Sequence, residues 1–290
     1  MKNNLSIKSV LSRIGSAETD EKGSKVPVEE VQKNLLLIYK DVYDACEKNG
    51  LRLFLQGGTL LGKVRHNGFI PWDDDMDLGM AREEYDRFIE IFDSVLGKEY
   101  ALKAPGYKDG SDARFIHIYK KEPTEQFIDS DKTLCLDVFP IDYAPDNIVR
   151  RTLKGIKSNA LMFIEGSKSF DDYCSPEMAA SLKKSASGYI NYYIRKTVAW
   201  VYRKKAIDSI QGKIDKAVCY KKKGKLCTSA TGRWHYFGEL QDSNVFFPLK
   251  RTDFCGIGAW TINQEEEYLR HNYGPDYMKI PPEHERERHF

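Results

Sequence analysis

The sequence predicts an α/β (α+β) fold, a mixed sheet flanked by helices, and three kinds of segment predict it. Apolar residues recur at spacings of three and four from Val28 to Cys46, which is typical of a helix with one buried face. A short, closely bounded apolar run at Leu51–Leu55 indicates a buried strand. Two later segments, Ala113–Tyr119 and Thr133–Ile141, also have the composition of strands, so helices and strands alternate along the chain.

The elements follow one another from the N-terminus. Residues 1–27 are polar and rich in Gly, Ser and Lys, and we expect them to be poorly ordered. The first helix stops at Asn49–Gly50 and delivers the chain to the strand at Leu51–Leu55. A second helical stretch opens at Thr59 and runs through Val64, and Arg82–Leu96 has the pattern of another amphipathic helix.

Candidate functional residues begin with a glycine turn. Gly57 and Gly58 lie between the predicted strand and the helix that opens at Thr59. Glycines in this position let backbone N–H groups approach a phosphate closely, and a helix N-terminus favours negative charge there. A glycine pair alone also fits an ordinary turn, so its meaning depends on the residues that follow.

Four carboxylates follow shortly after this turn, at Asp73, Asp74, Asp75 and Asp77. Residues two apart in a strand share a face, so Asp75 and Asp77 project together while Met76 and Leu78 face the core. Adjacent carboxylates raise each other's pKa unless a cation neutralises them, and a hard divalent ion such as Mg²⁺ or Mn²⁺ suits them. An acidic cluster alone fits a solvated loop, but apolar residues interleaved at period two favour a site.

A third carboxylate lies in the later predicted strand. Asp137 stands between Leu136 and Val138, where an unpaired carboxylate is costly, so we predict that it joins the metal site. A turn role suits Asp142 better than Asp137, because Asp142 precedes Tyr143-Ala144-Pro145. A glycine turn followed by paired strand carboxylates predicts a metal-dependent phosphoryl-transfer site.

These residues carry a family resemblance. The stretch Gly57–Gly62, the pair Arg65–His66 and the run Gly68–Met80 together resemble the signature of the LicD family, and Leu136–Asp142 is similar to its next segment. Its members are phosphocholine and related phosphotransferases, similar to the fukutin proteins that transfer ribitol phosphate. They form a branch of the polymerase-beta-type nucleotidyltransferase superfamily, whose mark is a glycine turn, two strand aspartates and a third carboxylate from a neighbouring strand.

The resemblance implies a nucleotidyltransferase-type sheet and a set of site residues. It implies that Asp75, Asp77 and Asp137 hold Mg²⁺ or Mn²⁺. Asp73 is a further candidate ligand, because it shares the strand face of Asp75 if the strand starts early. Phosphate oxygens of the substrate would meet the turn residues Gly57, Gly58 and Thr59. The rest of the expected substrate-binding set is Arg65, which would offset charge as the bond breaks, with His66, Trp72 and, outside the signature, Lys120.

The resemblance also implies a reaction. The expected donor is CDP-choline, the acceptor is a sugar hydroxyl on a glycan, teichoic-acid or lipopolysaccharide precursor, including lipid-linked glycans, and CMP is released. Two alternatives stay open: transfer of ribitol phosphate or another CDP-activated alcohol phosphate, and a non-catalytic protein that binds glycan or lipid surfaces. Cys255 stands where the family usually has Glu, and a proline usual near Thr261–Ile262 is missing, so the donor and acceptor stay open.

The resemblance has two parts, roughly residues 28–145 and 235–290. This suggests one catalytic α/β domain interrupted by a helical insertion. We therefore predict a flexible segment 1–27, a catalytic core 28–149, a basic helical insertion 150–225 and a C-terminal part 226–290 that completes the catalytic domain.

Charge is distributed unevenly along the chain. The formal net charge is +2, too close to zero to indicate a nucleic-acid partner, yet residues 150–225 hold 18 basic and 6 acidic residues. Ser185–Lys205 mixes aromatic and apolar residues with Arg and Lys. It fits either a core-packing helix with solvated lysines or an interfacial surface for anionic lipid headgroups or a lipid-linked acceptor. No recognisable nucleic-acid module is present, so we expect no nucleic-acid partner.

The cysteines and the start of the chain bear on location. The six cysteines are scattered and form no C-x-x-C pair, so neither a zinc ribbon nor a thioredoxin-type motif is expected. The chain starts without an apolar signal core, and no run approaches the roughly 18 apolar residues of a membrane span. We expect a reduced, cytoplasmic protein, with peripheral contact at the inner face of the membrane as an open possibility.

Overall fold

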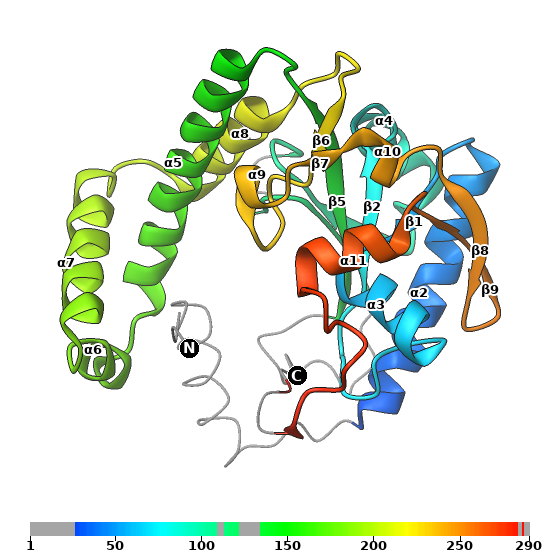
Figure 1. Ribbon diagram of the computed structural model, residues 1–290, viewed down its shortest axis with the longest axis horizontal. Helices are drawn as coiled ribbons and strands as arrows, with labels where there is room; N and C mark the ends of the chain where they lie inside the picture. Colours follow the sequence, from blue (N-terminus) through cyan, green and yellow to red (C-terminus); the bar gives the residue numbers. More distant parts are fainter. Residues whose placement is uncertain (1–26, 109–112, 122–133, 284–285, 287–290) are drawn as a thin grey trace.

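The computed structural model describes residues 27–108, 113–121, 134–283 and 286, and Figure 1 shows its central sheet with helices packed around it. The predicted α/β class is confirmed, because the described residues form one nine-stranded mixed sheet and ten helices. The expectation of poor order in residues 1–27 concerns a segment that lies, apart from Pro27, outside the described residues.

The sheet has the order β3-β4-β5-β2-β1-β9-β8, and β6 and β7 extend it beyond β5. The pairs β2–β5 and β1–β9 are parallel and the other pairs are antiparallel. The strands are β1 (Phe54–Leu55), β2 (Asp77–Ala81), β3 (Tyr100–Lys103), β4 (Ile116–Lys120), β5 (Cys135–Ala144), β6 (Leu226–Thr228), β7 (Gln241–Asp242), β8 (Lys250–Phe254) and β9 (Ile257–Thr261).

The helices differ in how they begin. Asn147, Ser175 and Ser185 each accept a hydrogen bond from a first-turn backbone N–H group, as N-cap side chains do. The helices are α2 (Val28–Lys48), α3 (Gly57–His66), α4 (Arg82–Val95), α5 (Ile148–Tyr173), α6 (Pro176–Leu182), α7 (Ala186–Val201), α8 (Ile207–Val218), α9 (His235–Gly238), α10 (Ser243–Phe246) and α11 (Glu265–Tyr273).

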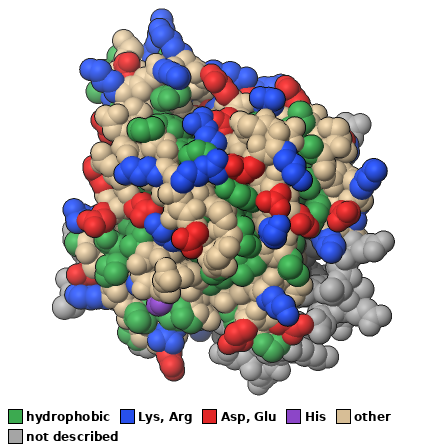
Figure 2. Space-filling view, turned by 90° about the vertical axis from the view of Figure 1, so that its right-hand side faces the viewer, with side chains coloured by type: hydrophobic (Ala, Val, Ile, Leu, Met, Phe, Trp, Pro, Cys, Tyr) green, Lys and Arg blue, Asp and Glu red, His purple; other side chains and the backbone are tan. Residues whose placement is uncertain are grey.

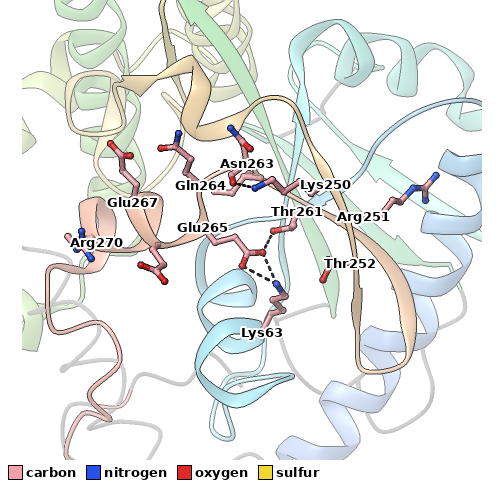
Figure 3. A pocket seen from close by; sticks show the side chains of 12 residues that line it. Lys63, Lys250, Arg251, Thr252, Thr261, Asn263, Gln264, Glu265, Glu267 and Arg270 are labelled. Carbon is pink, nitrogen blue, oxygen red and sulfur yellow. Dashed lines mark hydrogen bonds and ion pairs between the residues drawn. The ribbon is translucent and has the colours of Figure 1, made fainter.

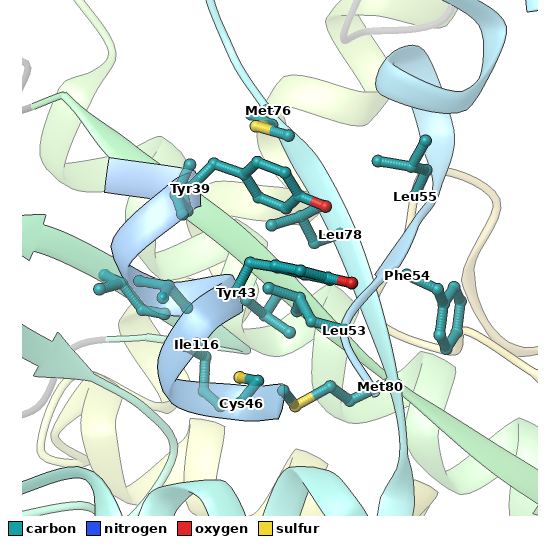
Figure 4. Packing of buried hydrophobic residues seen from close by; sticks show 14 of the residues in the cluster. Tyr39, Tyr43, Cys46, Leu53, Phe54, Leu55, Met76, Leu78, Met80 and Ile116 are labelled. Carbon is teal, nitrogen blue, oxygen red and sulfur yellow. The ribbon is translucent and has the colours of Figure 1, made fainter. Parts of the chain in front are cut away.

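Helix α2 covers one face of the sheet. Its apolar residues at spacings of three and four, which predicted the helix, are buried, and Tyr39, Tyr43 and Cys46 pack beside Leu78 and Met80 of β2 (Figure 4). Residues in successive strand positions point to opposite faces, so the side chains between these core residues emerge on the other face of the sheet. That second face carries the candidate site.

The first strand is shorter than predicted. Leu51 and Leu53 are buried, as the strand prediction requires, but only Phe54–Leu55 pairs with neighbouring strands. The Leu51 N–H group donates to Cys46 O at the end of α2 (2.9 Å), and the Arg52 N–H group donates to the Glu84 carboxylate (2.6 Å). Because these donors are used elsewhere, they form no ladder with a strand.

Two other elements depart from the sequence prediction. Strand β2 begins at Asp77, so Asp75 precedes the strand, and β3 was not predicted at all. Cys255 lies in the turn of the β8–β9 hairpin with a φ of 50°, and it is exposed. The residue that departs from the family pattern therefore forms a hairpin turn.

Residues 148–218 form the helices α5 to α8, which stand on the left of the sheet in Figure 1. After them the chain returns, and β6 pairs with the end of β5 at Asp142↔Thr228. A second, smaller apolar cluster joins this part to the sheet; it contains Ala144, Met162, Ile210, Ile214, Val218, Ala230 and Tyr236.

Candidate active site

The centre of the candidate site is a row of polar side chains across three adjacent strands. Asp77 of β2 is paired with Asp137 of β5, and Asp137 is paired with His117 of β4. Directly paired residues share a face of the sheet, so these three side chains project on the same side. Just after β1, the Gln56 N–H group donates to Asp77 O at 3.2 Å and so connects this strand end to the row.

Asp73 and Asp75 approach this row from the loop before β2. Burial, followed by the negative charge of Asp77, raises the pKa of Asp73 to about 7. Burial also raises the pKa of Asp75, with further contributions from Asp73 and Asp137. Asp73, Asp75, Asp77 and Asp137 therefore act on one another within a single acidic cluster, and their role as metal ligands remains a prediction. Asp74 is also buried, with 1% of its surface exposed, and its charge adds to the raised pKa values of Asp73 and Asp75.

The glycine turn meets the same cluster. Gly57 has a φ of +55°, and the Gly58 N–H group at the start of α3 donates to Asp77 Oδ2 at 3.1 Å. A Cβ atom on Gly57 would lie 2.3 Å from that oxygen, so only glycine allows this approach. The helix N-terminus predicted to meet phosphate therefore contacts the Asp77 carboxylate, which its positive dipole end stabilises.

Thr59 has a structural contact in the site. Its hydroxyl Oγ1 accepts a hydrogen bond from the Asp77 N–H group at 2.8 Å, and the side chain is 2% exposed. This contact fixes the start of β2 against α3. The predicted contact between Thr59 and phosphate remains a prediction.

The predicted cation pair, Arg65 and His66, lies at the end of α3 beside Trp72. Arg65 donates from Nε to His66 Nε2 (2.9 Å) and from Nη1 to Tyr277 O (3.0 Å), and its guanidinium is 5.9 Å from the Trp72 ring centroid. The charge of Asp73 acts on the pKa of Arg65, which burial lowers. Arg65 therefore lies near the acidic cluster, and its hydrogen bond to Tyr277 O holds the segment around Tyr277 against the end of α3.

Lys120 lies elsewhere. It is at the end of β4 and exposed, and it shares the strand face of Ile116 and Ile118, which are core residues. His117 and Asp137 project from the opposite face. The structure thus does not bring Lys120 to the carboxylates. The sequence alone did not show on which face of β4 the Lys120 side chain would lie.

Two tyrosines of α11 complete the site, and sequence reasoning missed them. The Gly57 N–H group donates to the Tyr268 hydroxyl at 3.3 Å. Burial raises the pKa of Tyr273, to which the nearby charges of Asp77, Asp73 and Asp75 add, while Arg233 opposes the shift. These residues follow the carboxylates by some 130 to 200 positions, so no local pattern connects them to the site.

Arg233 is an exposed cation near the acidic cluster. It shares the electrostatic environment of Tyr273, and its guanidinium is 5.3 Å from the centroid of the exposed Trp234 ring. A cation and an aromatic ring therefore lie together on the side of Tyr273.

Asp137 has a second set of neighbours. His117 Nδ1 is 2.6 Å from Asp137 Oδ1, and Cys135 Sγ donates to the same oxygen at 3.4 Å. The potential ligand atoms of these three residues lie within 4.8 Å of one another. Oxygen ligands dominate on the Asp77 side, so the cluster as a whole suits Mg²⁺ or Mn²⁺, which prefer oxygen.

A groove of about 630 Å³ lies apart from the carboxylates, between α3, the β8–β9 hairpin and α11 (Figure 3). Two of its charged groups pair with each other: Lys63 Nζ is 2.7 Å from Glu265 Oε1, and Thr261 also donates to Glu265. These contacts connect α3 to α11 and need no ligand. On the nearby face in Figure 2, Lys and Arg side chains are interspersed with Asp and Glu.

The acidic cluster fits a divalent cation by its own chemistry. Four carboxylates gather where burial and mutual repulsion raise the pKa values of two of them, Asp73 and Asp75. Negative charge concentrated in this way is stabilised by a hard cation with oxygen ligands. The arrangement therefore suits phosphoryl transfer.

Comparisons with known proteins point to the same chemistry. Residues 50–160 match the LicD/FKTN/FKRP nucleotidyltransferase domain. The chain is 26% identical over 276 residues to the lipopolysaccharide cholinephosphotransferase LicD of Haemophilus influenzae, covering 91% of this chain and 96% of that protein. It is 49% identical over 88 residues to the human ribitol 5-phosphate transferase FKRP, covering 30% of this chain and 18% of that protein.

Proposed function

This chain is a member of the LicD/FKTN/FKRP nucleotidyltransferase-domain family, and from that premise we propose that it is a metal-dependent phosphotransferase. It transfers phosphocholine from CDP-choline to a sugar hydroxyl of a cell-surface glycan precursor and releases CMP. The observation that supports this most is the gathering of Asp73, Asp75, Asp77 and Asp137 beside the Gly57–Gly58 turn.

The cofactor in this proposal is Mg²⁺ or Mn²⁺, held by Asp75, Asp77 and Asp137 with Asp73 as a further ligand. A divalent cation in such a site offsets the charge of a diphosphate and favours departure of the nucleotide. The glycine turn supports the ligands: the Gly58 N–H group holds Asp77 Oδ2, and the Thr59 hydroxyl holds the Asp77 backbone. The ligand Asp77 is therefore positioned before any ion binds.

In the reaction, the oxygen of the acceptor hydroxyl forms a bond to the phosphorus of phosphocholine, and the bond from that phosphorus to the CMP oxygen breaks. The hydroxyl proton passes to a base. His117 can receive it at Nε2, because its Nδ1 is hydrogen-bonded to Asp137. Arg233 and, near Asp73, Arg65 offset the negative charge that leaves with CMP.

The cargo has two candidates. Similarity across nearly the full length of a cholinephosphotransferase favours phosphocholine, at 26% identity. The 49% identity to a ribitol 5-phosphate transferase covers only 88 residues, and it favours ribitol phosphate as the alternative. Because the family match at residues 50–160 is to the nucleotidyltransferase domain, it supports a CDP-activated donor in both cases more strongly than either alcohol.

The test is CMP release by the purified chain. CDP-choline, CDP-ribitol and CTP are incubated separately with glycan acceptors, with Mg²⁺, with Mn²⁺ and with a chelator. We expect metal-dependent CMP release from CDP-choline. Release confined to CDP-ribitol would replace choline by ribitol, and release from no donor would support the non-catalytic surface-binding alternative.

The matched variants are Asp77→Asn and Asp44→Asn. Asp77→Asn should lower turnover by about a hundredfold or more, because it removes a charged ligand from the cluster. Asp44 lies on α2 with 44% of its side chain exposed and pairs with Lys40 one turn earlier, so Asp44→Asn should keep normal turnover. Equal turnover in both variants would contradict the ligand assignment.

A further inference from the structure

Helix α7 carries most of its apolar residues on its outer side, away from α5, which is unexpected for a helix that packs only within the protein. Its inner side packs on α5: the rings of Tyr192 and Phe170 are 5.9 Å apart, and the Arg195 guanidinium is 5.1 Å from the Phe163 ring. Ala199 is its only buried residue. The inner side of α7 is therefore partly polar, and most apolar residues of the helix lie elsewhere.

Those residues form one exposed face. At 100° per residue, their positions fall within an arc of about 140°. Their exposed fractions run from 46% to 63%, for Tyr189, Ile190, Tyr193, Ile194, Trp200 and Val201. An amphipathic helix normally turns such a face to the core, and a contiguous exposed apolar face marks an interaction site. We call these six residues the α7 face.

Cations border the α7 face. Lys183 Nζ is 4.3 Å from the Tyr192 ring and 5.6 Å from the Tyr193 ring, and the Arg203 guanidinium is 4.5 Å from the Trp200 ring. Lys204 and Lys205 follow directly and are exposed. The segment 150–225, to which α7 belongs, has a net charge of +12 in a chain whose total is +2. The partner of the α7 face must therefore be both apolar and anionic.

We propose that the α7 face docks on the surface of an anionic lipid bilayer, with α7 lying in the plane of the interface. Aromatic and branched apolar side chains enter the boundary between headgroups and acyl chains, and the bordering Lys and Arg side chains meet anionic headgroups. Among the described residues no helix is both long and apolar enough to cross a bilayer, so this contact is peripheral.

A second copy of the chain is the competing occupant. Two α7 faces packed together would place two segments of charge +12 against each other, and this repulsion disfavours the dimer. An anionic bilayer instead gains from the same charge. Docking depends only on the exposed face and its charges, and therefore not on which substrate the active site takes.

The experiment is co-sedimentation of the full chain with vesicles of phosphatidylcholine alone and of phosphatidylcholine mixed equally with phosphatidylglycerol. We expect binding to the anionic vesicles that weakens as salt rises, and binding to the neutral vesicles weaker by about tenfold or more. Equal binding to both vesicles, or no binding to either, would overturn the proposal.

Two variants locate the surface. Ile190→Glu combined with Ile194→Glu should lower the affinity for anionic vesicles by about tenfold or more, because it places charges in the apolar face. Leu37→Glu is the matched control, because Leu37 is an apolar residue of α2 with 57% of its surface exposed. This variant should bind the vesicles as the native chain does. Circular dichroism confirms that each variant is folded.

The outcomes separate the occupants. Binding retained by the double variant, or lost equally by Leu37→Glu, would place the contact elsewhere and overturn the proposal. A concentration-dependent dimer that the double variant abolishes, without vesicle binding by the native chain, would assign the α7 face to a second copy. CMP release in solution is measured in parallel, so failure of docking is distinguished from failure of the enzyme.

Discussion

His117 determines how the Asp137 carboxylate is held. The hydrogen bond between His117 Nδ1 and Asp137 Oδ1 is 2.6 Å long, and the Phe115 ring packs on His117 with centroids 4.6 Å apart. A ligand oriented by a hydrogen-bonded neighbour binds a cation more tightly than one that must first be ordered, and loss of such a neighbour typically costs about 10- to 100-fold in metal affinity.

His117→Ala should therefore weaken the apparent affinity for Mn²⁺ by about 10- to 100-fold. The measurement is a Mn²⁺ titration followed by the thermal shift of the protein, which does not require turnover. Lys120→Ala is the matched control, because Lys120 lies on the same strand but on the face opposite to His117. If both variants weakened Mn²⁺ binding equally, the hydrogen bond to Asp137 would not be the cause.

Gly57 is the second residue whose identity the site requires. An alanine there must adopt a φ of +55° and place its Cβ atom 2.3 Å from Asp77 Oδ2, so either α3 or the carboxylate must move. We expect Gly57→Ala to lower the free energy of unfolding by about 2 kcal/mol or more. Gly212→Ala is the contrast, because Gly212 lies inside α8 with open space around its Cβ position.

Urea denaturation of both variants measures the difference. Gly212→Ala should raise the free energy of unfolding by about 0.5–1 kcal/mol, since alanine costs less conformational entropy in a helix. If Gly57→Ala proved as stable and as active as the native chain, then the close approach of α3 to Asp77 would not be needed.

At the scale of elements, the short helix α9 is held by a buried acid. The Trp234 N–H group donates to Glu239 Oε1 at 3.1 Å, and Glu239 is 4% exposed. Burial raises the pKa of Glu239 to about 7 from its ordinary value of 4.5. The folded state therefore binds this proton more tightly than the unfolded state, and stability falls as the pH rises from about 4.5 to about 7.

Glu239→Gln should remove this loss, because glutamine can still accept from Trp234 but carries no charge. Its free energy of unfolding should exceed that of the native chain by up to about 2–3 kcal/mol at pH 8, and the difference should shrink towards pH 5. Denaturant unfolding at several pH values measures it. A difference that did not depend on pH would mean that Glu239 is not protonated in the folded chain at pH 5.

The same scale shows what could be predicted from the sequence. Period-two alternation identified the acidic cluster, since a carboxylate between apolar strand residues, such as Asp137 between Leu136 and Val138, has few structural reasons to exist. The strand register then brings two of the carboxylates together, because the parallel pairing of β2 with β5 places Asp77 directly beside Asp137. Convergence was predictable because it depends on local pattern and on the family's strand order.

What could not be predicted depends on distant contacts. Asp142, for which the sequence favours a turn role, lies within β5 and pairs with Arg82. Arg82 also pairs with Asp215 of α8, which follows Asp142 by some 70 residues. Tyr268 and Tyr273 enter the site only because α11 packs on α3. No residue near the carboxylates in the sequence indicates these contacts, which form only in the folded chain.

At the scale of the whole molecule, Arg82 connects the sheet to the helices α5 to α8. It donates from Nε to Asp142 Oδ1 (2.9 Å) and from Nη2 to Asp142 Oδ2 (2.7 Å), and Nη1 donates to Asp215 Oδ1 of α8 (2.8 Å). Arg82 is 3% exposed and Asp142 is fully buried. Asp142 also accepts from the Tyr220 N–H group after α8, so one buried cluster holds both parts of the chain.

Arg82→Met should lower the free energy of unfolding by about 3–5 kcal/mol, because it leaves Asp142 buried without its cation. Combining it with Asp142→Leu should recover much of that loss, since removing both charges leaves neither of them buried and unpaired. Asp93→Asn breaks the exposed pair with Lys108 and should produce no measurable change in the free energy of unfolding.

Hydrogen exchange reports which elements of Arg82→Met lose protection first. Helices α8 and α5 should lose protection before β1 and β2 do, because the broken contact joins the helices to the sheet. Uniform loss of protection across the sheet and the helices would instead mean that both parts unfold as one cooperative unit, and that Arg82 stabilises the whole rather than the junction.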